Sequence, residues 1–233
     1  DPVSLLNKVP IVDAVPTPGI KDNPPLIAKF VGENWSKLLK SLTPWDAKKS
    51  LICGSLPILS LRNTVLFPGV VIPITAGRDA SIKLINDANK GGKVVGVVAQ
   101  KDESVEKPAA KDIHETGTVA RILRVLKMPD GNVTVIIQGK KRFKVAEVLT
   151  ETPYMNATIR DIPEAKPALK NKEFSAIIDS IKDLALEIIK ESPNIPSEAS
   201  FAIKNIESNS FLVNFVSSNM NLSVSEKQSL LEI

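Results

Sequence analysis

The sequence predicts an α+β fold, in which a closed or half-closed sheet of about six short strands with one helix precedes an α-helical subdomain. Residues 56–163 alternate short apolar runs with turn signals, as strands do. Residues 164–233 change to the 3.6-residue period of amphipathic helices. The first 55 residues hold seven of the seventeen prolines and form a separate proline-rich extension.

The extension combines an extended part with one predicted helix. Proline removes backbone donors and restricts the preceding residue, so residues 1–25 should be extended. Residues 26–42 have helical apolar spacing. Their stripe includes Phe30, Trp35, Leu38 and Leu39. A stripe with such rings needs a surface to cover, either on its own domain or, as an assembly helix, on a neighbouring subunit.

Short apolar runs between breakers define the strands of residues 56–163. The predicted strands are Leu56–Leu61, Val70–Thr75, Val94–Gln100, Thr118–Met128, Val133–Gly139, Arg142–Leu149 and Tyr154–Ile162. The Pro129–Asn132 segment, PDGN, predicts the turn of a long hairpin. Strands this short favour a closed or half-closed sheet, because closure removes exposed edges.

Two connections complete this middle part. Arg78–Lys90 is predicted to be a helix that ends at the following pair of glycines. Lys101–Glu115 is charged and contains Pro108, so we expect a loop.

The last 70 residues are predicted to be helical. Apolar residues from Phe174 to Ile188 fall at i, i+3, i+4 and i+7 positions with charges opposite. Ser197–Ile206 and Phe211–Val216 are shorter candidates. Ser223 and Glu226 form a capping-box pattern for a final helix. That helix has no stop signal, so we expect the chain to be cut within it.

Composition excludes few classes of protein. Hydrophobic residues make up 43% and charged residues 24%, which is ordinary for a globular protein. No apolar run reaches ~18 residues, so no membrane helix is expected. The single cysteine, Cys53, excludes an internal disulfide. Counted by segment, residues 56–163 carry a net +5 and residues 164–233 a net −3, which is weaker than a typical nucleic-acid footprint.

The residues needed for catalysis are missing. One histidine, His114, and one cysteine cannot form a histidine-based zinc site or a conventional Cys-His pair. The sequence lacks a phosphate-binding G-x-x-x-x-G-K-[ST] loop and a G-x-S-x-G elbow. We therefore expect no catalytic, metal-binding or cofactor-binding residues in this chain, which should not be an enzyme by itself. His114 should have a surface or capping role.

Two groups of residues are candidates for binding. The basic group could bind an anionic partner if the hairpin gathers it on one face, or it could be a solvated strand end. It consists of Arg121, Arg124, Lys140, Lys141 and Arg142. The apolar group is Leu66, Phe67 and Pro68, at a predicted turn. If the fold does not cover it, this turn could hold unfolded polypeptide by burial, with a sheet edge adding backbone hydrogen bonds.

Several blocks of the sequence, in order, resemble one family. The opening block, LPxLxLRxTVxFPGxVxPxxxGR, covers Leu56–Arg78. The later blocks are VVAQKD, ETGTVARIL, LKMPDGNVTVIIQGKKRF, TPYMNATI and SEKQSLLEI. Together they resemble the amino-terminal domain of the Lon family of ATP-dependent proteases, from about Leu56 to the end. The proline-rich extension lies outside this resemblance.

The resemblance implies a PUA-like β-domain over residues 56–163 and a helical subdomain over 164–233, truncated before the ATPase module. It implies a domain that recognises unfolded or degron-bearing substrates and aids subunit assembly in protein quality control. The parent would be a hexameric, cytoplasmic, bacterial-type serine protease with a Ser-Lys dyad, using ATP and Mg. Those motifs are absent here. The alternatives are a nucleic-acid-binding PUA-like module and a purely structural oligomerisation domain.

Overall fold

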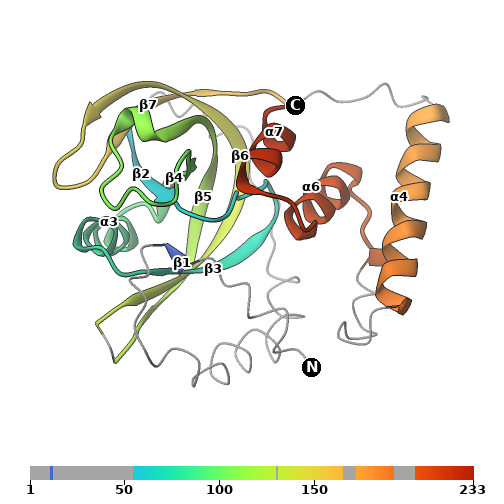
Figure 1. Ribbon diagram of the computed structural model, residues 1–233, viewed down its shortest axis with the longest axis horizontal. Helices are drawn as coiled ribbons and strands as arrows, with labels where there is room; N and C mark the ends of the chain where they lie inside the picture. The colour runs from blue at the N-terminus through green and yellow to red at the C-terminus, as the bar shows by residue number, and fades with distance from the viewer. Residues whose placement is uncertain (1–10, 13–54, 130, 165–171, 192–202) are drawn as a thin grey trace. The chain divides into compact units, whose positions relative to one another are not determined.

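The computed structural model describes residues 11–12, 55–129, 131–164, 172–191 and 203–233 (Figure 1). The predicted helix over 26–42 lies outside these residues. The described residues fall into two compact units. The sheet unit contains 11–12, 55–164 without residue 130, and 217–233, whereas the helical unit contains 172–191 and 203–216.

The sheet unit is a mixed sheet that closes on itself. Its strands are β1 (Ile11–Val12), β2 (Ser55–Leu61), β3 (Val71–Ala76), β4 (Val94–Gln100), β5 (Ile113–Lys127), β6 (Val133–Thr150) and β7 (Asn156–Asp161). The spatial order is β1-β3-β6-β5-β4-β2-β7, and a further β6–β7 pairing closes the ring. With helix α3 (Asp79–Lys90), this confirms the predicted α+β class and its barrel-like sheet.

Strand β6 corrects the prediction of two separate strands over Val133–Leu149. It runs unbroken for 18 residues. Its first half pairs with β3 and its second half with β7, along the same edge. The register against β5 shifts between Val119 and Ala120. Lys140 is the extra residue of β6 at this shift, and the strand continues past it.

The predicted loop over Lys101–Glu115 is too long at its C-terminal end. A 3-10 turn (Ala110–Asp112) leads directly into β5 at Ile113. His114 and Glu115 therefore lie in a strand. Ile113 is 3% exposed and packs in the core, so tertiary packing overrides the local charge that suggested a loop.

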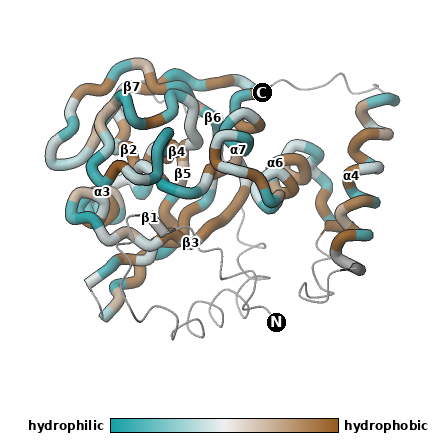
Figure 2. The backbone as a smooth tube through the Cα atoms, viewed as in Figure 1, coloured by the Kyte–Doolittle hydropathy of each residue, from teal (hydrophilic) through white to brown (hydrophobic). Residues whose placement is uncertain are grey.

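The interior of the sheet unit is mainly apolar, with a few buried polar side chains such as Gln100 and Thr118. Leu84 and Ile85 of α3 pack onto buried strand residues such as Ile74 and Ile137. Phe143 is fully buried in a second cluster with Val98. Figure 2 shows the hydrophobic stretches that follow the strands. As predicted, β4 is buried along almost its whole length.

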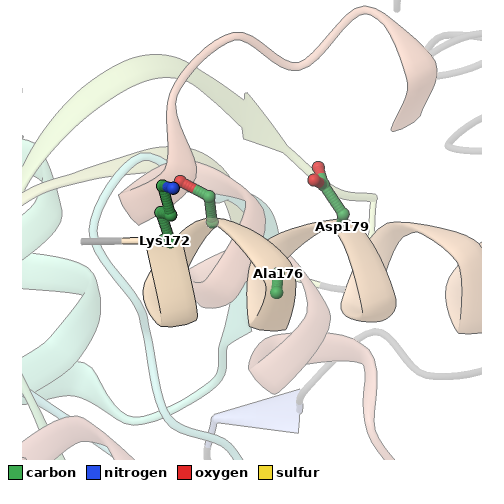
Figure 3. A pocket seen from close by; sticks show the side chains of 4 residues that line it. Lys172, Ala176 and Asp179 are labelled. Atoms are coloured by element: carbon green, nitrogen blue, oxygen red, sulfur yellow. The ribbon is translucent and has the colours of Figure 1, made fainter. Parts of the chain in front are cut away.

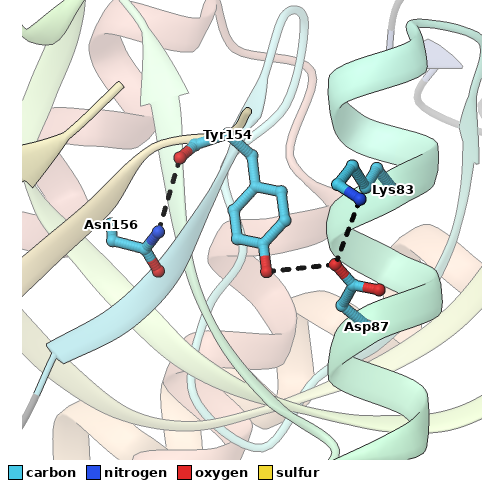
Figure 4. A network of polar contacts seen from close by, with 4 residues as sticks. All are labelled: Lys83, Asp87, Tyr154 and Asn156. Carbon is cyan, nitrogen blue, oxygen red and sulfur yellow. Dashed lines mark hydrogen bonds and ion pairs between the residues drawn. The ribbon is translucent and has the colours of Figure 1, made fainter. Parts of the chain in front are cut away.

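Helix α3 is also held by polar contacts (Figure 4). The Tyr154 hydroxyl donates to Asp87 Oδ2 at 3.3 Å, and Lys83 Nζ lies 3.9 Å from the same oxygen. Asn156 Nδ2 donates to the Tyr154 carbonyl at 3.4 Å. Desolvation and the neighbouring Asp87 carboxylate raise the pKa of Tyr154. These contacts connect α3 to the segment that enters β7.

Among the residues that the structure describes after the sheet, the helices are α4 (Lys172–Glu191), α6 (Asn209–Asn219) and α7 (Val224–Glu232). The capping box of the last helix is confirmed, because Ser223 accepts from the Glu226 N–H and the Glu226 carboxylate accepts from the Ser223 N–H.

The position of α7 differs from the domain organisation expected from sequence, since it belongs to the sheet unit. Gln228 Nε2 donates to the Thr116 carbonyl at 3.0 Å, and Arg142 Nη1 donates to the Leu231 carbonyl at 3.0 Å. Leu231 is 2% exposed and packs with Phe67. The final helix is therefore part of the structure around the barrel, although it follows the helical unit in sequence.

Candidate binding surfaces

The predicted apolar turn, Leu66, Phe67 and Pro68, is covered by the fold. Leu66 is 2% exposed, Phe67 is 1% exposed and Pro68 is buried. The Leu66 carbonyl accepts from Thr118 Oγ1 at 2.6 Å. Capture of polypeptide at this turn required an exposed patch. That requirement is not met. The Leu66 carbonyl instead bonds to β5, and the Phe67 side chain packs with Leu231 of α7.

The basic group does not converge on a single surface. Lys141 pairs with Asp161 on β7, whereas Arg142 donates to Leu231 of α7. Successive strand residues point to opposite faces, so these two cations cannot act together on one ligand. Lys140 donates to Gln138 on its own strand. Lys140, Lys141 and Arg142 thus bond within the chain, and Arg124 also has an interaction there.

Arg121 and Lys140 remain near each other on neighbouring strands. Partial burial, followed by the positive charge of Arg121, lowers the pKa of Lys140. Arg124 is exposed farther along β5, beyond a second register shift. The pair is a small local concentration of charge and lacks the aromatic residues of a base-stacking surface.

Helix α4 presents the largest group of exposed apolar side chains among the described residues. The apolar arc of this helix is wide, and only part of it is covered. Ile178 is 3% exposed and packs with Ile203 and Leu212. By contrast, Ile177 and Leu184 are each 58% exposed and Ile188 is 61% exposed.

The three exposed residues form one stripe. With about 100° per residue, Ile177, Leu184 and Ile188 lie within about 40° of one another around the helix. Their spacing of seven and four residues spans about 16 Å along the axis. We call these three residues the α4 stripe. A soluble helix normally covers such a stripe or uses it for binding.

The opposite side of α4 is more polar. Figure 3 shows Lys172, Ala176 and Asp179 beside a shallow hollow, which Ser175 also lines. These residues carry one cation, one anion and two small side chains, and all four belong to one helix. The hollow is therefore an open part of the helix surface and does not enclose a ligand. The two sides of α4 therefore differ in polarity.

The sequence singled out neither of these features of α4 as a binding surface. Its periodicity placed Ile177, Leu184 and Ile188 in the same apolar set as the covered residues. No signal in the sequence separates these three residues from the covered ones, because a stripe of this width is usual for an amphipathic helix.

The described residues contain no group of three or more His, Cys, Asp or Glu side chains placed to hold a metal ion. In that same part of the chain, no helix is long and apolar enough to cross a membrane. His114 is partly buried on β5, and desolvation lowers its pKa while Glu232 of α7 partly opposes the shift.

Comparison with solved structures defines the class of domain. The amino-terminal domain of a Mycobacterium avium complex Lon protease matches with a TM-score of 0.63 and 21% identity, over 77% of this chain and 90% of that one. A Lon amino-terminal domain from Xanthomonas campestris gives 0.55 and 17%, over the same shares. The chain thus has the fold of Lon amino-terminal domains.

Sequence comparison shows the family. Residues 55–233 match the substrate-binding domain of ATP-dependent protease La (LON). The chain is 67% identical to the Lon protease of Flavobacterium johnsoniae over 201 residues, which are 85% of this chain and 25% of that protein. For Cytophaga hutchinsonii Lon protease, identity is 49% over 76% of the chain and 22% of the relative. The chain belongs to the Lon protease family and spans about a quarter of these relatives.

Proposed function

We propose that this chain is the substrate-recognition part of a Lon protease and binds unfolded or degron-bearing proteins. Membership in the family of Lon substrate-binding domains supports the type of ligand. The exposed α4 stripe supports a place for binding, because large apolar side chains are available there to a partner. This stripe replaces the covered turn at Leu66–Pro68 as the candidate surface.

The chemistry of the stripe suits unfolded chains. Such chains expose apolar side chains that native proteins bury, and their sequences vary. Burial against Ile177, Leu184 and Ile188 needs no fixed sequence, since the hydrophobic effect is non-directional. Binding would therefore be reversible and broad in specificity. No covalent step is required from this chain.

The wider role concerns the parent enzyme. The relatives are Lon proteases, and we propose that this domain delivers clients to an ATP- and Mg-dependent motor with a serine protease active site. We place that work in the bacterial cytoplasm, as part of protein quality control. Help with subunit arrangement belongs to the same proposal, with the 26–42 segment as the candidate contact.

The test measures binding of the chain to a fluorescent, permanently unfolded polypeptide, reduced and carboxymethylated α-lactalbumin, across a salt series. A labelled RNA oligonucleotide is measured in parallel. Leu184→Asp introduces a charge into the α4 stripe. Leu149→Asp is the matched control, because Leu149 is 49% exposed at the end of β6 and lies outside the stripe.

We expect binding to the polypeptide that changes little with salt and falls by about tenfold or more for Leu184→Asp. Leu149→Asp should bind like the unaltered chain. RNA binding that is tighter than polypeptide binding, and that weakens steeply as salt is added, would favour the nucleic-acid alternative. If the chain binds neither ligand but associates with itself, and deletion of residues 1–45 abolishes this self-association, assembly would remain as the function.

A further inference from the structure

Strand β3 has an outer edge that the barrel does not use. Strands β2, β4, β5, β6 and β7 pair around a closed ring, whereas β3 is attached to β6 outside it. All six residues of β3 pair with β6, from Val71 opposite Gln138 to Ala76 opposite Val133. Among the described strands, only β1 pairs with the other edge of β3.

The backbone pattern identifies the groups at this edge. The Gly139 N–H donates to the Val70 carbonyl at 2.9 Å, so Val70 directs its backbone toward β6. Alternate residues of a strand direct their N–H and C=O groups to the same side. Val71, Pro73 and Thr75 consequently direct theirs to the outer edge. Proline in a sheet is confined largely to such edges.

A short segment of the same chain already occupies one end of this edge. Strand β1 pairs in parallel with β3, with Ile11 opposite Thr75 and Val12 opposite Ala76 (Figure 1). This pairing shows that the edge can accept an extended chain. It reaches only the last two residues of β3, and no other described strand pairs along Val71–Pro73.

The edge of β3 carries no charged residue, although Pro73 offers only a carbonyl there and no N–H donor. Charged side chains commonly protect exposed edges from added strands. The outer part of β5, beyond the reach of β4, carries Arg124 and Lys127. The sequence of β3, VIPITA, has no charged residue. Of these two edges, only that of β3 lacks charge.

We propose that the outer edge of β3 accepts an extended segment of a client polypeptide as an added parallel strand, in competition with Ile11–Val12. The inference rests on the proposed function for the type of ligand. It adds a second mode of contact, through backbone hydrogen bonds, to apolar burial. Strand addition reads no particular sequence, which suits clients of many sequences. The β1 segment then limits access to the edge.

The experiment uses a fluorescent decapeptide of alternating valine and threonine, and the same peptide N-methylated at every second residue. N-methylation removes the donors needed for pairing and retains the side chains. Anisotropy measures both peptides on the unaltered chain and on a variant with Ile11→Pro and Val12→Pro. The control variant carries Val3→Pro and Ile20→Pro, outside β1.

We expect the plain peptide to bind and its methylated form not to bind. Removing β1 pairing should tighten binding by about tenfold, because an intramolecular competitor lowers apparent affinity. The control variant should match the unaltered chain. Equal binding of both peptides, or no effect of the two β1 prolines, would overturn strand addition.

The two proposals fail in different ways. If carboxymethylated α-lactalbumin still binds and responds to Leu184→Asp, whereas peptide methylation has no effect, the β3 inference is wrong and the proposed function stands. If neither the protein probe nor the peptides bind, both are wrong.

Discussion

The strands of the sheet unit and helix α4 differ in how far their apolar side chains are exposed. In the strands, Leu149 is the one large apolar residue that is clearly exposed among those described. In α4, three large apolar residues of one helix are more than half exposed. The sheet unit therefore gains stability from its apolar residues, whereas α4 leaves three of its own exposed, where we propose that they bind substrate. Substitutions at the two places should separate stability from affinity.

The largest expected effect is on the stability of the barrel. Phe143→Ala removes a fully buried ring from the cluster that contains Val98 and Met155. The free energy of unfolding should fall by about 3–5 kcal/mol. Urea unfolding with Leu184→Ala as the comparison should show a change within about 0.5 kcal/mol for the α4 residue. If both substitutions lower the free energy of unfolding by similar amounts, the proposed difference between the barrel and α4 is wrong.

A glycine in the barrel should come next. A Cβ added at Gly117 would lie 2.3 Å from the Val97 carbonyl oxygen and 3.0 Å from Phe143 Cζ. Gly117→Ala should therefore lower the free energy of unfolding by about 1–3 kcal/mol. Gly92→Ala is the matched control, because a Cβ there meets nothing within 4 Å. Its thermal midpoint should equal or exceed that of the unaltered chain.

The capping box of α7 should have a smaller effect. Ser223→Ala removes an acceptor for the Glu226 N–H and should lower stability by about 1 kcal/mol. Because α7 covers Phe67, we expect the loss to appear in unfolding of the sheet unit. Ser225→Ala, at an exposed residue of the same turn, should have little effect. If the two serine variants unfold alike, α7 contributes little to the barrel.

The smallest effect concerns pH. Desolvation lowers the pKa of His114 in the folded chain, so the unfolded chain binds more protons there as pH falls. The stabilisation is fully present above the ordinary pKa of histidine and is lost as pH falls through the lowered value. In His114→Gln, stability should fall less between neutral and mildly acidic pH. Calorimetry at several pH values measures this slope, and an unchanged slope would contradict the assignment.

Local signals predicted much of the fold. The continuous apolar run Val94–Gln100 is observed with those bounds. The glycine pair after Lys90, the turn around Gly131 and the capping box at Ser223 also lie where local chemistry placed them. In each case the contacts that determine the structure join residues close in sequence, so local patterns are enough to predict it.

Long-range contacts account for the differences. Nothing near Leu66–Pro68 in sequence reveals that Leu231, far along the chain, packs with this region. The inclusion of α7 in the sheet unit could not be predicted for the same reason, since its contacts join residues that are far apart in sequence. Periodicity identified the apolar set of α4, but coverage by Ile203 and Leu212 depends on tertiary packing. Sequence therefore predicts which side chains are apolar better than which of them are available for binding.

Site-specific photo-crosslinking tests the central claim most directly. A benzophenone side chain replaces Leu184 in the α4 stripe, or Asp179 on the opposite, exposed side of the same helix. Each chain is irradiated with labelled, carboxymethylated α-lactalbumin, with native α-lactalbumin as the competitor control. We predict strong crosslinking from position 184 to the unfolded probe and little from position 179. Equal yields from the two positions, or none from position 184 while the probe binds, would contradict capture by the α4 stripe.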